Sequence, residues 1–323
     1  MEVREPAELA ALAASPLAAE LVDDVVVVDV DGAGAAGADL EPLADLPVVV
    51  VGIGAGPCPY VDVLVADDAA AEEVAAAAAA HPLAATALVL HLRASEPLGL
   101  SAGLVAESAT YSALQAGPEH RAWLAGRATR PPRADDGQRV RVSRRGRRVH
   151  IALARPAARN AVDAAMQRAL VDALGAVGDD VDQVLVTGDG PVFSAGGDLD
   201  EFGSLADPAS AHLLRLARSP ARALARVADR TTVVVQGACH GAGVELPAFA
   251  RRVVARPDAT FTLPEVAMGL VPGAGGTVSL PRRIGRQRTA WMALTGAAVD
   301  ATTARAWGPV SYTHLTLPTI CSV

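Results

Sequence analysis

The sequence predicts an α/β protein in two parts: a small N-terminal α/β unit over residues 1–130 and a larger domain over residues 139–309. Three observations support this fold class. Short valine-rich runs alternate with alanine-rich or amphipathic stretches throughout the chain. A stretch rich in proline and aspartate, residues 131–138, separates the two parts as a linker. Glycine clusters in the second part open helices directly off strands.

The composition is that of a globular protein and excludes several functions. Of 323 residues, 51% are hydrophobic, which is enough for a buried core, and the formal net charge is -8. An acidic balance with 3% aromatic residues argues against nucleic-acid binding. No apolar stretch resembles a signal peptide or approaches the roughly 18 residues of a membrane span. We therefore expect a cytoplasmic protein with neither a nucleic-acid nor a membrane partner.

The three cysteines, Cys58, Cys239 and Cys321, lie far apart and show no spacing typical of a metal site or redox pair. Reduced, unpaired thiols fit the expected compartment. The sequence therefore predicts no metal centre.

In the N-terminal unit, apolar runs predict strands and alanine-rich or amphipathic stretches predict helices. The expected strands are residues 25–30, 47–51, 61–65 and 86–92, and the expected helices are 69–80 and 100–115. Gly52, Gly54 and Gly56 follow a strand as in some dinucleotide-binding loops, but Pro57 and Pro59 stand where a helix should begin. A tight turn is the favoured interpretation.

The second part begins with a predicted hairpin. Residues 139–153 alternate charged and apolar residues around Arg145-Gly146, which indicates a hairpin with one solvated face. The alternative is a phosphate-binding role for some of its arginines. Asn160, with Asp163 three residues later, is expected to cap a helix. A strand at 184–186, a helix at 209–227 and a strand at 231–235 should follow.

Two glutamates carry the candidate chemistry. Glu245 comes after a Gly-Ala-Gly turn behind strand 231–235, so we expect it in the first turn of a helix. Glu265 follows a second short strand, 260–263, in a loop that leads to a glycine-rich turn at 273–276. Two such carboxyl groups in an apolar region suit acid/base chemistry on a water molecule. Singly, the first could serve a helix dipole and the second could be a solvated loop residue.

Three motifs together resemble the crotonase family, the enoyl-CoA hydratase/isomerase superfamily. Residues 193–199 read Phe-Ser-Ala-Gly-Gly-Asp-Leu, residues 241–246 read Gly-Ala-Gly-Val-Glu-Leu, and residues 264–270 read Pro-Glu-Val-Ala-Met-Gly-Leu. They occur in the family's order and at about its spacing, and the likeness covers residues 138–308. The resemblance implies a crotonase-like spiral of ββα units that binds an acyl-CoA substrate.

The resemblance also implies residue roles. Gly197 and Ala242 match the two backbone N–H donors of the family's oxyanion hole. Glu245 matches the residue that activates water for attack at C3, and Glu265 the residue that supplies the proton to C2. Further substrate-binding candidates are Ala195, Gly196, Asp198, Gly241 and Arg159, and for Asp198 we favour capping of the next short helix over action on the substrate. No cofactor is implied, because coenzyme A is part of the substrate.

Having both glutamates makes hydration of a 2-enoyl-CoA the preferred reaction, a lyase activity of fatty acid metabolism. The alternatives are isomerisation or thioester hydrolysis on the same scaffold, or a non-catalytic acyl-CoA-binding partner. His240 stands where the family has apolar residues, and we interpret it as a packed core histidine. A homotrimer or hexamer is implied for the full-length parent.

The two ends of the chain depart from the family pattern. Residues 310–323 differ in composition from the rest and resemble a translated sequencing adapter. We expect them to be a non-native tail on a domain that is C-terminally truncated near Gly308. Residues 103–124 resemble the family's C-terminal helices, which would make the N-terminal unit a degenerate relative of the second domain or a docking piece for it. The alternative is an amphipathic helix that matches by chance. We assign no catalytic residue to this unit.

Overall fold

The computed structural model describes residues 3–4, 25–31, 46–128, 137–204, 207–308 and 310–311. The chain forms two compact units that do not follow the chain order. The first comprises Met1–Ala125, Pro264–Val271 and Gly285–Ala297, and the second comprises Gly126–Leu263, Pro272–Ile284 and Ala298–Val323. Two short segments that the sequence placed in the second domain therefore group with the N-terminal part. Most of the expected linker lies outside the described residues.

The first unit contains a parallel sheet of valine-rich strands. Its order is β1 (Val3–Arg4), β2 (Val25–Asp29), β3 (Val49–Ile53) and β4 (Val63–Val65). The first three strands expected in this unit are thus confirmed. Gly52 and Ile53 end β3, and in the bend that follows, the Asp31 carboxylate accepts the N–H groups of Ala55 at 2.6 Å and Gly56 at 3.2 Å. No helix begins at these described residues, which agrees with a chain reversal and not with a dinucleotide-binding loop.

Four helices follow this sheet in the chain: α2 (Asp68–Ala80), α3 (Pro82–Ser95), α4 (Leu100–Gln115) and α5 (Pro118–Ala125). The expected strand at 86–92 is wrong, because these residues lie within α3. Pro82 starts the helix, and alanine and leucine favour helix over strand. Among the described helices none is by itself long and apolar enough to span a membrane; α2 and α3 pass only as a pair bent by 110°, on length and composition alone.

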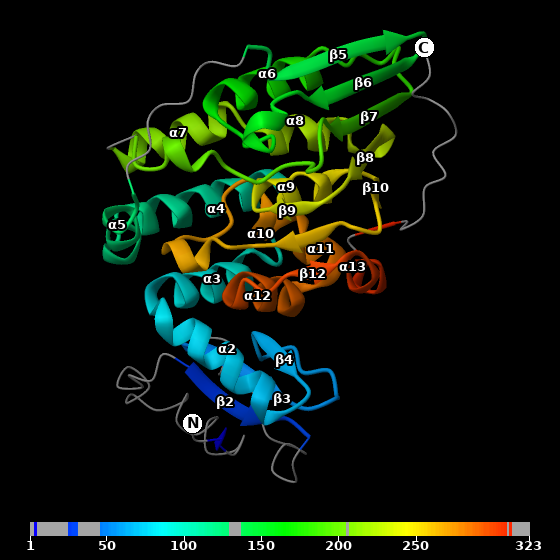
Figure 1. The fold of residues 1–323 in the computed structure, drawn as a ribbon. Coiled ribbons are helices and arrows are strands. Elements are labelled where there is room, and N and C mark those ends of the chain that lie inside the picture. The colour runs from blue at the N-terminus through cyan, green and yellow to red at the C-terminus, as the bar shows by residue number, and fades with distance from the viewer. Residues whose placement is uncertain are drawn as a thin grey trace. The chain divides into compact units, whose positions relative to one another are not determined.

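Helix α12 (Arg286–Thr295) comes late in the chain but packs against α2, α3 and β4 (Figure 1). The fully buried Asp62 connects α12 to the N-terminal segment, residues 1–125. Its carboxylate pairs with Arg93 Nε at 2.8 Å and with Arg286 Nη1 at 3.0 Å, and it also accepts the Val50 N–H at 2.9 Å. One buried carboxylate therefore joins sheet, α3 and α12.

The second unit is built on a five-stranded sheet. Its order is β10 (Arg252–Ala255), β8 (Thr231–Val235), β7 (Gln183–Gly188), β6 (Arg148–Leu153) and β5 (Val140–Arg145). The β5–β6 pair is antiparallel and the other pairs are parallel. All residues of β5 after Val140 are exposed, and Arg141 and Arg144 pair with surface aspartates. The predicted hairpin with a solvated face is confirmed.

Helices α6 (Ala164–Gly175), α7 (Pro208–Ala217) and α8 (Pro220–Arg226) belong to the same unit. The single helix expected at 209–227 is two helices, because Pro220 lacks an N–H and Ser219 caps a new start through Arg222 N at 3.2 Å. The expected cap by Asn160 is wrong. Asp163 caps α6 instead, accepting the Met166 N–H at 2.7 Å.

A small three-stranded sheet completes the second unit, in the order β12 (Val299–Asp300), β11 (Thr260–Thr262) and β9 (Ala238–His240). The remaining helices of this unit are α9 (Ala242–Glu245), α10 (Gly276–Ser279), α11 (Pro281–Ile284) and α13 (Ala301–Trp307). Single-turn 3-10 helices occur at η3 (Pro156–Ala158), η4 (Leu199–Glu201), η5 (Ala228–Arg230), η6 (Pro247–Phe249) and, in the first unit, η7 (Val266–Met268). The fold is mixed α/β, as expected. Of the expected tail, residues 312–323 lie outside the described residues.

Candidate active site

Two glycine-containing loops of the second unit lie backbone to backbone. One contains residues 193–198, and the other joins β9 to α9. His240 N donates to Ser194 O at 3.2 Å. A Cβ on Gly196 would lie 2.8 Å from His240 O, and one on Gly243 would lie 2.3 Å from Ser194 O. Larger residues are therefore excluded, and the glycines allow the two motifs to meet.

The hydrogen bonds around Gly197 fix the direction of its N–H group. Val162 forms a parallel bridge with Gly197, in which Val162 N donates to Gly196 O at 2.7 Å and Asp198 N donates to Val162 O at 3.1 Å. These bonds use the neighbours of Gly197. The N–H of Gly197 itself consequently points away from Val162.

Ala242 is the first residue of α9, directly after Gly241, whose φ is 45°. The Gly241 carbonyl accepts the N–H groups of Val244 at 2.7 Å and Glu245 at 2.9 Å. The first N–H groups of a helix have no intrahelical acceptor, and they carry the positive end of the helix dipole. Ala242 therefore presents an N–H donor at the junction of the two loops.

Glu245 closes the same short helix and is buried, with 2% of its surface exposed. Its Oε2 accepts the N–H groups of Ala274 at 2.7 Å and Gly276 at 2.8 Å. Burial raises the pKa of Glu245 to about 7, although the two N–H groups lower it in part. A carboxyl group with this pKa can both take up and release a proton near neutral pH, as a general base must.

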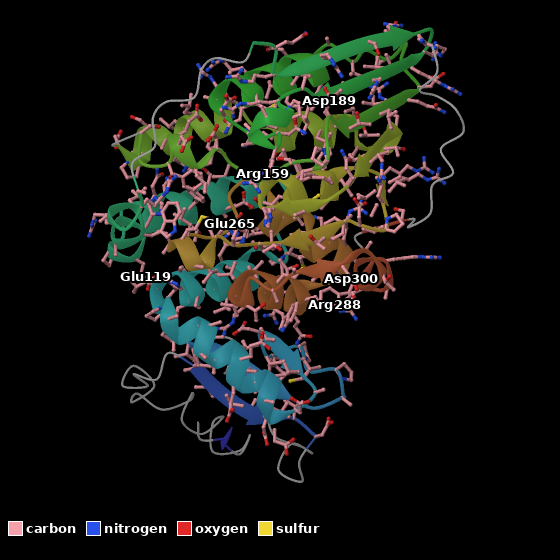
Figure 2. The ribbon with its side chains drawn as sticks, in the orientation of Figure 1. Glu119, Arg159, Asp189, Glu265, Arg288 and Asp300 are labelled. Carbon is pink, nitrogen blue, oxygen red and sulfur yellow. The ribbon has the colours of Figure 1, made fainter. Side chains whose placement is uncertain are left out.

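Glu265 belongs to the first unit, where Figure 2 labels it. It is 9% exposed and stands immediately before η7, so the alternative of a solvated loop residue is wrong. Its carbonyl accepts the N–H groups of Met268 at 2.9 Å and Leu270 at 3.0 Å. The structure thus brings Gly197, Ala242 and Glu245 together in one unit and describes Glu265 in the other.

The remaining substrate-binding candidates lie along the first loop and before it. Ala195 N donates to the carbonyl of Arg159, an exposed residue with a φ of 52°. The Asp198 carboxylate caps η4 through Asp200 N at 3.1 Å and pairs with buried Arg155 at 2.5 Å. These contacts confirm the helix-capping interpretation of Asp198.

Asn160 supports the site in a way that sequence reasoning missed. Its Nδ2 donates to Asp189 O and Val192 O, both at 2.9 Å, and its Oδ1 accepts the Arg155 N–H at 2.9 Å. Asn160 has a φ of 52°, a left-handed conformation that asparagine tolerates better than most residues. An asparagine in a short loop was the sequence signal that could have indicated this role.

His240 and the cysteines have surroundings that limit their chemistry. Burial, and then the charge of Arg159, lower the pKa of His240, which favours its neutral form. The residue is only partly buried, so the interpretation as a core histidine holds in part. Burial raises the pKa of Cys239 to about 12, so this thiol is a poor nucleophile. Cys58 and Cys239 are both free and buried, and Cys321 lies outside the described residues. In the described part of the chain no three potential metal ligands cluster.

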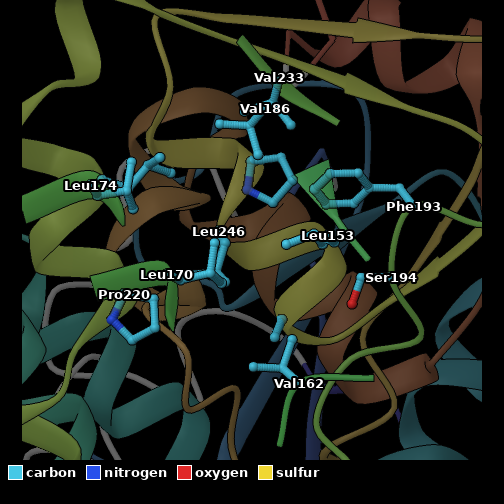
Figure 3. A pocket seen from close by; sticks show the side chains of 13 residues that line it. Leu153, Val162, Leu170, Leu174, Val186, Phe193, Ser194, Pro220, Val233 and Leu246 are labelled. Carbon is cyan, nitrogen blue, oxygen red and sulfur yellow. The ribbon is translucent and has the colours of Figure 1, made fainter. Parts of the chain in front are cut away.

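An apolar cavity of about 450 Å³, including space open to solvent, borders both loops through Ser194 and Ala242 (Figure 3). Its other lining residues are Leu153, Val162, Leu170, Leu174, Val186, Phe193, Pro220, Leu224, Val233, Leu246 and Pro247. Apolar surroundings lower the local dielectric and strengthen hydrogen bonds made at their border.

The sequence is similar to a known protein family. The enoyl-CoA hydratase/isomerase family matches residues 147–313. The chain is 37% identical over 173 residues to the 2,3-dehydroadipyl-CoA hydratase of Escherichia coli K12, covering 53% of this chain and 67% of that protein. It spans about two thirds of the length of the curated relatives it matches.

Solved structures agree with this match. An enoyl-CoA hydratase from Thermoplasma volcanium GSS1 is similar with a TM-score of 0.50 and 33% identity, over 55% of this chain and 72% of that one. A Thermobifida fusca YX protein solved in complex with acetoacetyl-CoA is similar with a TM-score of 0.51 and 27% identity, over 54% and 73%. With the matched motifs and their geometry, these similarities establish that the chain belongs to the enoyl-CoA hydratase/isomerase family, the crotonase family.

Proposed function

We propose that this protein binds an acyl-CoA thioester and adds water across the 2,3 double bond of a 2-enoyl-CoA. The observation that carries the proposal is the position of Glu245: a buried carboxyl group at the end of the helix that Ala242 opens, where it accepts the N–H groups of Ala274 and Gly276. Burial at this position raises its pKa to about 7. A base with this pKa, one helical turn from an N–H donor, suits hydration of a polarised double bond.

In the proposed mechanism the thioester oxygen accepts hydrogen bonds from the N–H groups of Gly197 and Ala242. The helix dipole of α9 adds to the positive potential at that point. As C3 is attacked, negative charge moves onto this oxygen. Each such donor typically contributes a factor of about 100 to 1,000 in kcat.

The two glutamates divide the proton transfers. Glu245 takes a proton from water while the water oxygen bonds to C3. Glu265 gives a proton to C2, which removes the negative charge from the thioester oxygen. Exchange with solvent then returns Glu245 to the carboxylate and Glu265 to the acid. The atoms of one water molecule are added, and no electrons are exchanged with a cofactor.

The test is the loss of the absorbance of the conjugated thioester of crotonyl-CoA. Glu245→Gln and Glu265→Gln should each lower kcat by about 100-fold to 10,000-fold, because each removes one proton-transfer group. Asp258→Asn is the matched control, since it neutralises an exposed carboxylate of the second unit that pairs with Arg256. Full activity in either glutamine variant would contradict the assigned role.

Product analysis separates the alternatives on the same scaffold. Isomerisation would move the double bond, and thioester hydrolysis would release free coenzyme A. Binding of a CoA thioester without any product would favour a non-catalytic binding partner. We also propose a cytoplasmic location and a homotrimer or hexamer for the full-length protein. Analytical ultracentrifugation measures the oligomeric state.

A further inference from the structure

Helix α5 of the N-terminal segment contacts the turn that begins at Glu265, and both belong to the first unit. His120, in the first turn of α5, is only 1% exposed. Its Nδ1 lies 2.9 Å from the carbonyl oxygen of Met268. Because a carbonyl oxygen can only accept, Nδ1 carries the proton of this hydrogen bond.

The turn is short and internally bonded, so a contact at one residue affects the others. The Glu265 carbonyl accepts the N–H groups of Met268 and Leu270. Gly269 ends the turn with a φ of 69°, and a Cβ there would lie 2.5 Å from His120 N and 2.7 Å from the carbonyl carbon of Glu119. The backbone of α5 therefore rests directly on the turn.

Glu119, the neighbour of His120, anchors α5 on its other side. Its carboxylate oxygens accept the N–H groups of Leu83 at 2.8 Å and Ala84 at 3.0 Å, at the start of α3 (Figure 2). A carboxylate is favourable at a helix N-terminus. Trp123 stacks on the His120 ring, with centroids 5.5 Å apart and planes at 19°, and this fixes the orientation of the ring. His120 is thus held from two directions.

We propose that His120 is a positioning residue for Glu265, so that the N-terminal segment contributes to catalysis through this hydrogen bond. The inference rests on the proposed function, in which Glu265 transfers a proton. A misplacement of about 1 Å in a catalytic group can cost about 100-fold in rate. Because the contact acts on Glu265 and not on the loops of Gly197 and Ala242, its loss should lower kcat and leave KM nearly unchanged.

The experiment compares two variants of the full chain. His120→Leu removes the donor and keeps an apolar side chain, whereas His120→Asn keeps an N–H near the position of Nδ1. Hydrogen exchange of the amides of residues 264–271 is measured by mass spectrometry, alongside kcat and KM for crotonyl-CoA. His81→Leu is the control, a same-type change at a residue whose side chain does not cap α3.

His120→Leu should raise exchange in 264–271 and lower kcat by about 10-fold to 100-fold, with KM within about three-fold of the parent. His120→Asn should restore much of the exchange protection and much of kcat, and His81→Leu should change neither the exchange nor kcat. If His120→Leu does not fold, His120→Gln, which moves the donor one bond further, is compared with His120→Asn.

Unchanged exchange in 264–271 in a folded His120→Leu protein would overturn the proposal, as would raised exchange with parental kcat. The exchange measurement does not depend on turnover. A parent that fails to hydrate crotonyl-CoA would refute the proposed function for that substrate, while the exchange result would still decide whether His120 holds the turn.

Discussion

Gly276 is the residue whose substitution tests the placement of Glu245 most directly. It begins α10, and its φ lies outside the left-handed region, so alanine meets no backbone penalty there. The added Cβ would lie 2.6 Å from Glu245 Cγ and 2.7 Å from Oε2. Ordinary contact begins at 3.4 Å, so the Glu245 side chain must move away by about 0.8 Å. Because Glu245 is buried among other residues, this movement displaces its carboxyl group from the position in which it accepts its two N–H groups.

Gly276→Ala should therefore lower kcat by about 100-fold, the usual effect of a displacement near 1 Å, with a much smaller change in KM. A second effect concerns protonation. Longer bonds from the N–H groups of Ala274 and Gly276 stabilise the carboxylate less, so the pKa of Glu245 should rise above about 7. Since the base acts only when deprotonated, the acid limb of the pH–rate profile should move to higher pH.

The assay is steady-state hydration of crotonyl-CoA across neutral pH. Gly175→Ala is the control: this glycine ends α6 and a Cβ there would meet nothing within 4 Å. Its kcat and pH profile should equal those of the parent. Parental kcat together with an unmoved acid limb in Gly276→Ala would refute the argument that this glycine reserves space for the base.

Three further changes have defined outcomes. The folded-state pKa of Glu245, about 7, is above the ordinary 4.5, so the free energy of unfolding should fall as pH rises from 4.5 through 7. In urea denaturation this fall should be roughly 3 kcal/mol in the parent and absent in Glu245→Gln. An equal pH dependence in both proteins would contradict this. Asp62→Asn leaves Arg93 and Arg286 without a buried counter-charge and should cost about 3–5 kcal/mol of unfolding free energy, with a change below about 1 kcal/mol arguing against a structural role. Asn160→Ala removes three hydrogen bonds, so the free energy of unfolding should fall by about 1–3 kcal/mol and kcat should also fall. An unchanged kcat would show that the Asn160 loop does not support the active site.

Local chemistry made much of the second unit predictable. The Gly-Ala-Gly turn before Glu245 predicts a helix start off a strand, and α9 begins at Ala242. Alternating charge around Gly146 predicts the β5–β6 hairpin. In both cases the signal and the structure it specifies lie within a few residues of one another.

Long-range contacts made the rest unpredictable. Asp62 and Arg286 are 224 residues apart, and nothing in either neighbourhood indicates their pairing. Asn160 has the residue type of a helix cap, but its side chain bonds carbonyls about 30 residues away. The segment 86–92 is apolar enough for a strand, whereas its alanine and leucine content and Pro82 before it favour α3.

Among the described strands, β5 forms one outer edge of the five-stranded sheet, and peptide groups on such an edge can pair with a strand from another molecule. Exposed arginines line this strand, and Arg141 and Arg144 are paired with Asp189 and Asp180. Bringing two such edges together would place rows of guanidinium groups opposite each other and strip them of water. We therefore expect edge-to-edge association through β5 to be unfavourable, and replacing its exposed arginines with valine would remove this repulsion without touching the core.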